Sequence, residues 1–574
     1  MGKRADRASP RAVTDRSVLS RVGAVCIAML FAAVAVRGGE SITYTLTPLP
    51  AEGKLKVEIA WVTGQRTNSA LRVPPRWGNV DDIPALIEDV TIDAPRNSSE
   101  AAAVAQRGVW PFAHRPGATV ACRYSVSSRK LGIDWSRTYT PAITQTFFCG
   151  LGNSFLLTPG GVGGIPDEME VLLRWQLPAT WKAACSLGVG RSVGRRVRIE
   201  DLRQSAFLAG ELDTRTRERD GRKVSVAMLD RFRFDADAFA DMADAIVGGQ
   251  CRFMGEKDFP EFLVLAVPVG TAVGEGESHL AGVGLYHSFV LFVAPQSRLT
   301  DGVEQLFAHE LFHFWNGRLL EAAEPEGLVY WFTEGFTDYY AMRILFESGR
   351  WDAATFAKWT NRHIREYVCN PAIRASNDEI QREYWSQRET VGQVAYQRGF
   401  LLGLRWHRLA RQRGVSDGVD RLFKALVTRA RSASTKLSNE LIRHVGNETL
   451  GAWFDAEFER YVVNAEPVDV PADALSPALT GRASQAYEFS LGFDRKRSLE
   501  QKRVIGLSAE SPAARAGLRE GDELAGWTLH SDPDRKISLR VKRDGSVQPI
   551  EFLPRGAARQ TIYFVPGNKS RDER

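Results

Sequence analysis

The amino-acid sequence predicts a multidomain α+β protein, and three observations carry that prediction. The chain has 574 residues, whereas a single hydrophobic core rarely grows beyond about 250–300. Strand-type patterns dominate residues 41–225, and helix-type patterns become frequent within residues 226–465. Strand patterns return in residues 481–566, after a Pro-containing stretch at 466–480 that is typical of a linker.

Residues 1–36 predict either an export signal or an uncleaved N-terminal anchor. Five arginines between Arg4 and Arg21 precede an uncharged apolar run from Val22 to Val36, and Ala33-Val34-Ala35 fits a cleavage site. That run is short for a membrane span, which needs about 20 residues. We therefore expect an exported protein, periplasmic or secreted, with no membrane contact beyond this segment; sequencing the mature N-terminus tests the expectation.

The next segment, residues 41–225, is expected to form a β-rich N-terminal domain. Its clearest strands are Ile42 to Leu46, Lys54 to Ala60 and Glu170 to Trp175, where strand-forming residues alternate or cluster. Gly and Pro interrupt the segment often, as they do between short strands. No catalytic pattern stands out here.

Residues 226–465 combine helices with two strong strands. The predicted elements are a helix Asp235 to Val247, strands Glu261 to Val267 and Ser288 to Val293, and helices Gln393 to Arg413 and Asp417 to Ala430. A Gly-rich loop from Gly270 to Gly284 separates the two strands. The second strand is either an edge that pairs with a bound peptide or an ordinary buried strand.

The sequence His309-Glu310-Leu311-Phe312-His313 predicts a catalytic zinc site. Two histidines four residues apart on a helix project from one face and can hold one metal ion. Glu310 is placed to take a proton from water as general base. Glu334, in a second segment, supplies a carboxylate as third ligand. Three protein ligands leave a position open on one Zn²⁺ ion, as catalytic sites do.

Local patterns around the motif predict two helices. Asp301 with Glu304 fits a capping box, and Gly317 suits the C-terminus, so the histidine pair is expected mid-helix. A second helix is expected from Phe332 to Glu347, with Asp338 on the same face as Glu334. Asp338 either orients a ligand histidine through its other ring nitrogen or is a solvated surface charge.

The wider segment resembles the glycyl aminopeptidase family of zinc metallopeptidases. The resemblance rests on the run from His309 to Gly317 and on the run from Trp331 to Tyr340. It implies a thermolysin-like core with a helical lobe, related to aminopeptidase N. It also implies His309, His313 and Glu334 as zinc ligands and Glu310 as general base. Tyr396, in Tyr396-Gln397-Arg398-Gly399, would donate a hydrogen bond to the oxyanion; the alternative is a packing aromatic.

One position departs from that family. Its members carry a glutamate in a Gly-rich segment, where it holds the free amino terminus of the substrate. Here the corresponding stretch places Tyr286 between Gly284 and His287, and all three are candidate substrate contacts. A tyrosine carries no charge at neutral pH to pair with an ammonium. Either Glu275 or Glu277 substitutes, or the enzyme accepts peptides without a free amino terminus.

Residues 481–566 resemble a PDZ domain. Ser490-Leu491-Gly492-Phe493 is similar to its carboxylate-binding loop, and the run from Ser511 to Asp522 matches the helix and turn that follow. The resemblance implies a peptide ligand, bound by adding a strand to a sheet. The unit would recruit substrate or only pack against the catalytic domain. Residues 567–574 form a polar tail.

Composition narrows the function classes. The formal net charge is +6, from 75 Lys and Arg against 69 Asp and Glu, without a basic stripe of the nucleic-acid-binding type. Cysteines 122, 149, 185, 251 and 369 show no CxxC spacing, so a second zinc site is not expected. In an exported protein the first three are candidates for a disulfide.

The sequence therefore predicts a zinc-dependent peptidase acting on peptides or proteins. The family resemblance implies an aminopeptidase that prefers small N-terminal residues. Two alternatives stay open: a zinc endopeptidase that needs no free amine, and a catalytically decayed protein whose PDZ unit binds peptides.

Overall fold

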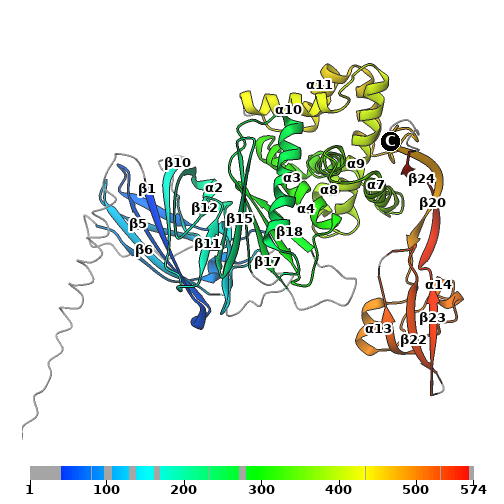
Figure 1. Ribbon diagram of the computed structural model, residues 1–574, viewed down its shortest axis with the longest axis horizontal. Helices are drawn as coiled ribbons and strands as arrows, with labels where there is room; N and C mark the ends of the chain where they lie inside the picture. Colours follow the sequence, from blue (N-terminus) through cyan, green and yellow to red (C-terminus); the bar gives the residue numbers. More distant parts are fainter. Residues whose placement is uncertain are drawn as a thin grey trace, which may run out of the picture.

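The computed structural model describes residues 41–78, 80–95, 107–127, 138–160, 168–229, 232–269, 280–433, 435–530, 532–543 and 545–567. Along the chain, a strand-rich N-terminal part is followed by a mixed sheet with helices, a helical part and a small C-terminal β unit (Figure 1). Strands and helices thus segregate along the sequence, which confirms the multidomain α+β class with a β-rich N-terminal part and a helical later part.

The N-terminal part is built from three sheets with the strand orders β13-β10-β1-β2-β6-β4, β12-β11-β14-β8-β7 and β5-β3-β9. Their strands are β1 (Ser41–Leu49), β2 (Lys54–Val62), β3 (Asn68–Arg72), β4 (Ile87–Asp93), β5 (Val109–Ala113), β6 (Thr119–Ser127), β7 (Ala142–Ile143), β8 (Phe147–Leu151), β9 (Thr158–Gly160), β10 (Glu168–Trp175), β11 (Lys182–Cys185), β12 (Gly188–Val189), β13 (Ser192–Arg198) and β14 (Ala206–Gly210).

Alternation of buried and partly exposed side chains explains why these residues form strands. In β1, Ile42, Tyr44 and Leu46 are fully buried, and the residues between them face the other side of the sheet. The two longest predicted strands next to it, β2 and β10, pair with β1 on either side. All three predicted N-terminal strands are therefore confirmed as strands.

A further sheet, with parallel and antiparallel strands, belongs to the catalytic part. Its order is β15-β16-β17-β19-β18, with bounds β15 (Leu212–Arg219), β16 (Arg222–Leu229), β17 (Phe262–Pro268), β18 (Leu280–Leu285) and β19 (Ser288–Val293). Because β16 pairs with β17 in parallel, β15 and β16 join this sheet, although β15 precedes residue 226 and β16 begins before it. Sequence periodicity could not reveal this, since strands of either sheet carry the same pattern.

The edge of this sheet is β18, and β19 is an inner strand. Ser288–Val293 is buried at all six positions and pairs with β17 on one side and β18 on the other. The possibility that it is the peptide-pairing edge was wrong, and its alternative, a buried strand, is confirmed. Strand β18, whose residues are mostly part-exposed, lies beside helix α4 and has no partner strand on one side among the described residues.

The helices are α2 (Ile199–Arg203), α3 (Ala236–Met254), α4 (Asp301–Phe312), α5 (Tyr330–Thr333), α6 (Gly335–Glu347), α7 (Ala353–Val368), α8 (Asn377–Glu383), α9 (Val391–Gln412), α10 (Asp420–Ala433), α11 (Asn439–Leu450), α12 (Trp453–Phe458), α13 (Arg495–Gln501) and α14 (Pro512–Arg515). Asp235 caps α3 by accepting a hydrogen bond from the backbone N–H of Ala238, 2.7 Å away. The predicted helices α3, α9 and α10 are confirmed.

Helices α6 and α9 cross very closely at two glycines. A Cβ atom added to Gly399 would lie 1.7 Å from the carbonyl oxygen of Trp331, and one added to Gly335 would lie 2.4 Å from the Cα of Gly399. No side chain fits between the two backbones there. This crossing brings α9, which carries Tyr396, against the turn that carries Glu334.

The segment expected to be a linker is packed against the catalytic part. Residues 466–478 have no regular structure apart from turns, but Val468 and Ala474 are buried in the main hydrophobic core. The backbone N–H of Val468 donates a hydrogen bond to the Tyr367 hydroxyl at 2.9 Å. The segment therefore fixes the chain to the helical part instead of separating two free domains.

Beyond it, the C-terminal residues form a small β unit. Strands β20 (Leu479–Phe489) and β24 (Arg555–Pro566) make a long antiparallel ribbon, and β21 (Glu523–Thr528), β22 (Ile537–Arg543) and β23 (Ser546–Phe552) make a three-stranded sheet. The unit has its own hydrophobic core and extends away from the rest in Figure 1. Its ribbon contacts α7, where Asn361 exchanges hydrogen bonds with the backbone of Phe564.

Two further predictions concern the cysteines and the ends of the chain. All five cysteines from Cys122 to Cys369 are free thiols, so the disulfide considered for an exported protein is not formed. The N-terminal signal or anchor, residues 1–36, lies outside the described residues, as do Glu275, Glu277 and the 568–574 part of the tail. None of the described helices combines the length and apolarity that crossing a membrane requires.

The glycine crossing gives a stability prediction. Gly399→Ala forces a methyl group into the backbone of Trp331, so we expect the protein to lose about 3 kcal/mol or more of stability. Thermal and urea unfolding measure the loss. Gly302→Ala is the matched control, because the nearest atom to its new methyl is 3.5 Å away and alanine favours a helix. Equal midpoints for the two variants would contradict the crossing.

Candidate metal centre

Helix α4 brings the two motif histidines together at its C-terminal end. The helix runs from Asp301 to Phe312, so His309 lies in its last turn and His313 immediately follows it in helical φ and ψ. The predicted mid-helix position was wrong. Residues Phe314–Leu319 continue as an irregular π-type segment, and Gly317 has φ 157°, where the chain leaves the helical path.

The predicted capping box is also wrong. Thr300 occupies the N-cap position, and Asp301 makes its side-chain contacts with Lys358 and, at 2.9 Å, with the indole of Trp359. Glu304 is buried and accepts hydrogen bonds from Arg350 and Trp351. Both acids therefore tie α4 to the α6–α7 region. Local sequence could not show this, because the partners lie about 50 residues further along.

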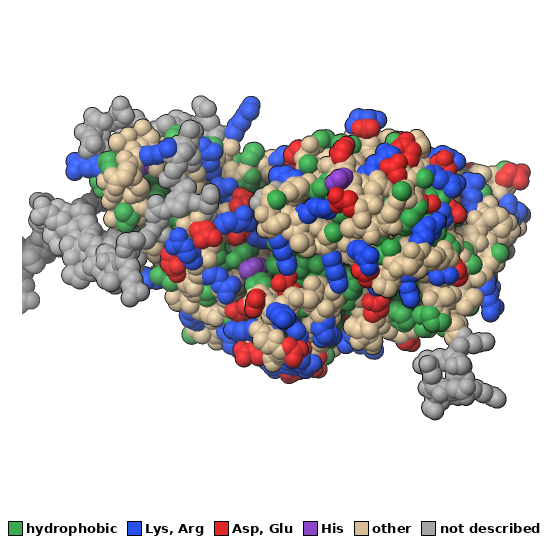
Figure 2. All heavy atoms as spheres, turned by 90° about the horizontal axis from the view of Figure 1, so that it is seen from above, with side chains coloured by type: hydrophobic (Ala, Val, Ile, Leu, Met, Phe, Trp, Pro, Cys, Tyr) green, Lys and Arg blue, Asp and Glu red, His purple; other side chains and the backbone are tan. Residues whose placement is uncertain are grey.

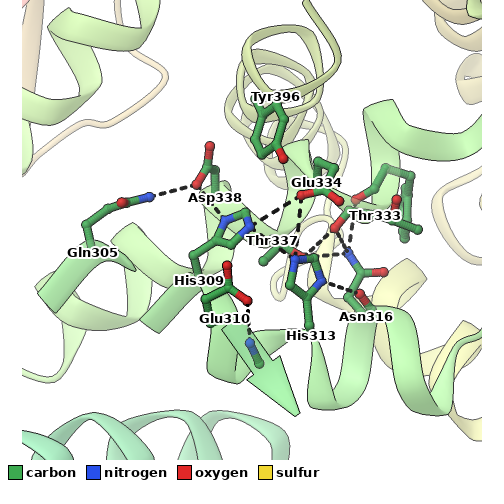
Figure 3. Close-up of polar contacts among 12 residues, drawn as sticks. Gln305, His309, Glu310, His313, Asn316, Thr333, Glu334, Thr337, Asp338 and Tyr396 are labelled. Atoms are coloured by element: carbon green, nitrogen blue, oxygen red, sulfur yellow. Dashed lines mark hydrogen bonds and ion pairs between the residues drawn. The ribbon is translucent and has the colours of Figure 1, made fainter. Parts of the chain in front are cut away.

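Glu334 completes a group of three ligands. It lies at the junction of α5 and α6, and its Oε2 is 3.4 Å from Nε2 of His309 and 3.6 Å from Nε2 of His313. The two imidazole Nε2 atoms are 3.1 Å apart. Figure 3 shows all three side chains converging on one point. Within the described residues, this is the one cluster of three or more His, Cys, Asp or Glu suited to a metal ion.

These distances fit a tetrahedral zinc ion. Zn–N and Zn–O bonds of about 2.0–2.2 Å place neighbouring ligand atoms of a tetrahedron about 3.3–3.6 Å apart, close to the three separations seen here. The other ring nitrogens are occupied: Nδ1 of His309 faces Asp338 at 2.8 Å, and Nδ1 of His313 faces the carbonyl of Asn316 at 3.0 Å. Both Nε2 lone pairs therefore point at the same place, where a cation removes their repulsion.

The electrostatics of the cluster favour positive charge. Burial alone would disfavour an imidazolium at His309, but the carboxylates of Asp338 and Glu334 outweigh it and raise the pKa of His309 well above its usual value. Burial likewise opposes the Glu334 carboxylate, yet His313 and His309 hold the pKa of Glu334 well below its usual range. An environment that holds protons on two imidazoles also attracts a divalent cation.

Asp338 orients His309 and is itself held by a third histidine. Its Oδ1 accepts hydrogen bonds from His309 Nδ1 and from Gln305 Nε2, each at 2.8 Å, and its Oδ2 lies 3.2 Å from Nε2 of His363. The side chain is buried. The orienting role thus has its geometry, and the solvated surface charge considered as its alternative is wrong.

His363 on α7 was not singled out from the sequence. Its Nδ1 faces the carbonyl of Trp359 at 3.0 Å, and its Nε2 faces the Asp338 carboxylate. Both partners are acceptors, so only the doubly protonated ring donates to each. Burial opposes that charge, but Asp338 outweighs it and raises the pKa of His363. A buried cation thus balances one carboxylate of the centre. Its spacing in sequence carried no signal of this contact.

Asn316 ties the end of α4 to the segment that carries Glu334. Its Nδ2 donates hydrogen bonds to the carbonyls of Phe332 and Thr333, at 2.9 and 3.2 Å, and to the Thr337 hydroxyl at 3.1 Å. The backbone carbonyl of Asn316 accepts a hydrogen bond from Nδ1 of His313. One fully buried side chain thus fixes the distance between the two parts of the ligand set. Its place within the family-like run was the only sequence signal.

Glu310 lies beside the ligands and faces the edge strand. Its Oε2 accepts a hydrogen bond of 2.8 Å from the backbone N–H of Gly284 on β18 (Figure 3). A Cβ atom at Gly284 would lie 2.8 Å from the Glu310 carbonyl oxygen, so only glycine lets β18 approach α4 this closely. Gly284, predicted as a substrate contact, therefore lies next to the predicted base.

Tyr396 lies over the ligand group and carries a neutral phenol. Its ring stacks on His309 with centroids 5.9 Å apart, and Figure 3 shows the hydroxyl directed toward Glu334. The hydroxyl is 3.0 Å from that of Tyr384 and accepts from Arg388 Nη2 at 2.9 Å. Burial first, then the Glu334 carboxylate, raises the pKa of Tyr396 well above its usual value, so the phenol keeps its proton.

Tyr139 of the N-terminal part also lies near the predicted base. Burial and then the Glu310 carboxylate raise the pKa of Tyr139 to about 12. The tyrosine packs edge-on against Trp77. Neither this residue nor the pair Tyr384 and Arg388 was predicted, because each comes from a segment without a recognisable motif.

A pocket of about 420 Å³ opens between the N-terminal part and the metal centre. Glu310, His313 and Gly284 line it on the catalytic side, and Arg198 and Asp201 are among its N-terminal residues. Charged side chains of both signs are interspersed over the face shown in Figure 2.

Tyr286 and His287, both predicted substrate contacts, do not line this pocket. They form the turn between β18 and β19, with their rings stacked at 3.9 Å between centroids. Tyr286 is 9% exposed and packs into the core of the N-terminal part. In this turn both side chains lie outside the pocket. Alternation along a strand could not predict their direction, because it does not extend into the turn.

The comparisons with known proteins agree with this geometry. A family model described as M61 glycyl aminopeptidase matches residues 303–401. The match confirms the family resemblance seen in the sequence, and the matched segment contains the three ligands together with Glu310 and Tyr396. A search of curated proteins finds no significant match.

One solved structure shows the same overall fold, and two others align more weakly. An aminopeptidase N family protein from Idiomarina loihiensis aligns with a TM-score of 0.66 and 16% identity, over 91% of this chain and 98% of that chain. An M1 zinc metallopeptidase from Deinococcus radiodurans aligns with a TM-score of 0.48 and 17% identity, over 76% and 96%. A mutant metallopeptidase from the same organism, bound to a Tyr-Ser-Ala substrate, aligns with a TM-score of 0.46 and 16% identity, over 75% and 95%.

The Asp338 contacts give a metal-affinity prediction. Asp338→Asn removes the carboxylate that orients His309 and balances His363, so we expect the zinc dissociation constant to rise about 10–100-fold. Competition with a zinc-binding dye measures it, and circular dichroism monitors the fold. Asp241→Asn, on the exposed face of α3, is the matched control. Equal zinc affinity in both variants would exclude the orienting role.

Proposed function

We propose that this chain is a zinc-dependent peptidase that hydrolyses peptide bonds at the centre formed by His309, His313 and Glu334. The observation that carries the proposal is the convergence of the three ligand atoms within 4.8 Å of one another, with Glu310 adjacent. The match of residues 303–401 to a metallopeptidase family supports it. A zinc ion held there supplies Lewis acidity for attack on a carbonyl.

Glu310 acts as general base and then as general acid. Its carboxylate lies at the pocket, beside His313 and next to Gly284 of the edge strand. It takes a proton from the attacking water as the new C–O bond forms, and it passes that proton to the amine nitrogen as the C–N bond breaks. Its hydrogen bond from Gly284 fixes the carboxylate in this position.

Tyr396 donates a hydrogen bond to the oxyanion as it forms. A donor is useful here only while it keeps its proton, and burial together with the nearby Glu334 carboxylate holds the pKa of Tyr396 well above neutrality. Arg388, 2.9 Å from the hydroxyl, donates into its lone pair and leaves the phenolic proton free to point elsewhere.

Strand β18 holds the substrate backbone. Among the described residues one edge of this strand has no partner strand, and the strand lies next to the metal helix α4. An extended peptide that pairs with this edge is bound through N–H and C=O groups irrespective of its side chains. Peptide and protein substrates are therefore the class that the site fits.

Aminopeptidase activity with preference for small N-terminal residues follows from the family resemblance. The alternative, an endopeptidase, is favoured by one observation: Tyr286 replaces the expected glutamate and is buried away from the pocket. A carboxylate for the free amine then has to come from Glu275 or Glu277, in the loop outside the described residues.

The C-terminal unit remains a candidate PDZ-like peptide binder, and with it the reading of a decayed hydrolase stays open. The residues after the Leu491-Gly492-Phe493 loop form the short helix α13 in place of a strand. Strand addition next to that loop would need an exposed strand edge. We therefore favour a packing role for the unit, against α7 through its ribbon. Export of the whole protein also stays part of the proposal.

The proposed base gives a prediction on turnover. Glu310→Gln keeps the shape of the side chain but cannot accept the proton, so we expect normal zinc content and a loss of kcat of roughly 100-fold or more. Elemental analysis and a peptide-cleavage assay measure the two quantities. Glu321→Gln, an exposed neighbour of the same pocket, is the control. Native kcat in the Glu310 variant would refute the general-base role.

The mode of cleavage gives a second prediction. We expect the N-acetylated form of a cleaved peptide to be hydrolysed at a rate similar to the free form, since no described carboxylate replaces the glutamate at Tyr286. Mass spectrometry of the products locates the cut. If acetylation abolishes cleavage and Glu275→Gln with Glu277→Gln also abolishes it, the protein is an aminopeptidase whose amine anchor lies in that loop.

A further inference from the structure

The pocket beside the metal centre presents positive charge where an ammonium group would be expected to bind. The guanidinium of Arg318 lies over the ring of Tyr286, 4.7 Å from its centroid. Tyr286 is the residue aligned with the glutamate of the resembling enzymes, and Arg318, which lies over it, lines the pocket. An amino terminus that approaches this point meets a cation, so like charges oppose the usual anchor.

A second guanidinium lies close to the first, and one carboxylate serves both. Asp201 accepts from Arg198 at 3.0 Å and 2.8 Å, through Nε and Nη2, and also from Arg318. Two positive groups and one negative group leave this triad with a net charge of +1. Guanidinium groups stay protonated in proteins, so the excess persists at any physiological pH.

The other acidic side chains of the pocket are already paired. Glu200 accepts from Arg203 at 3.3 Å, and Glu321 accepts from Lys436 at 2.8 Å. Both side chains are more than half exposed, at 56% and 65%. Glu310 is the remaining acid of the lining, and it faces the metal ligands. Among the described lining residues, it is therefore the one carboxylate without a cationic side-chain partner, and it accepts its hydrogen bond from the backbone of Gly284.

His287, in the β18–β19 turn, lies near the same Arg318 guanidinium. Burial first, and then the guanidiniums of Arg318 and Arg195, lowers the pKa of His287 to about 4. Its Nδ1 is buried without a hydrogen-bond partner in the described part of the chain, as fits a ring that stays neutral. Two guanidiniums thus lie near the β18–β19 turn: Arg318 over the ring of Tyr286, and Arg195 near His287.

We propose that Arg198 and Arg318 form an anion subsite that binds a carboxylate of the peptide substrate, next to the scissile bond. The same pocket is lined by these guanidiniums and by Glu310 and His313. Because Arg318 lies over Tyr286, which aligns with the glutamate that holds the substrate's amino end in the resembling family, we assign the bound acidic side chain to the residue on the amino side of the cleaved bond. Arginine pairs bind carboxylates in a planar, directed way. The inference rests on the proposed peptidase function and names its preferred substrates: peptides with Asp or Glu at that position.

The test uses the zinc-loaded full chain. One peptide that is otherwise uncharged carries Glu, Gln or Lys immediately before the cleaved bond, and each version is prepared with a free and with an acetylated N-terminus. We expect kcat/KM for the Glu peptide to exceed that for the Gln peptide about tenfold, and the Lys peptide to be poorest. Salt at about 1 M should reduce the Glu preference, because it screens exposed charges.

Variants separate the subsite from a general effect on the fold. Arg318→Gln and, independently, the more exposed Arg198→Gln should bring the Glu:Gln ratio toward one. Asp201→Asn should raise the ratio, because it removes the competing carboxylate. Arg196→Gln is the matched control: this residue lies on the same strand as Arg198 and pairs with Glu168, outside the pocket.

The outcomes distinguish this inference from the function on which it rests. Cleavage of all three peptides at equal rates, or a Glu preference that survives both arginine substitutions, overturns the anion subsite and leaves the peptidase intact. If none of the peptides is cleaved by protein with full zinc content, the peptidase proposal itself fails.

Discussion

The close crossing of α6 and α9 at Gly335 and Gly399 is the constraint on which the metal centre depends. At this point the two backbones approach too closely for any side chain. Glu334 precedes Gly335 and Tyr396 precedes Gly399 by less than one turn, so the crossing places a metal ligand and a phenol over the same imidazole pair. A larger residue at either glycine would separate the Glu334 carboxylate from the Tyr396 phenol.

The same centre is held from behind by a chain of buried polar contacts. Nδ1 of His309 contacts the carboxylate of Asp338, and the same carboxylate contacts Nε2 of His363 on α7. Helix α7 also contacts the C-terminal unit: Asn361 donates to the ribbon at Phe564, and Arg365 binds Asp532, which lies between β21 and β22, at 3.2 Å. The small C-terminal unit therefore packs on the helix that completes the charge balance of the site. This position is compatible with a role in stabilising α7 as well as with substrate recruitment.

Much of the site could be predicted because its information is local. Spacing four residues apart fixes two histidines on one helix face, and the fit of the strands β1, β2 and β10 follows from alternation. The misjudged features depend on distant partners. Asp301 and Glu304 look like a cap but bind residues of the α6–α7 region, and β19 looks like an edge until β18 folds back beside it.

Short local motifs were sufficient to predict the candidate ligands, the candidate base and the family resemblance, because a few residues at fixed spacing carry that information. Packing turned Tyr286 into the N-terminal core, placed His363 against the Asp338 carboxylate, and let Arg198 and Arg318 share one carboxylate. The physical reason is that periodicity specifies the faces of one element, whereas charge balance depends on which faces meet, and that is settled by packing across segments far apart in the chain.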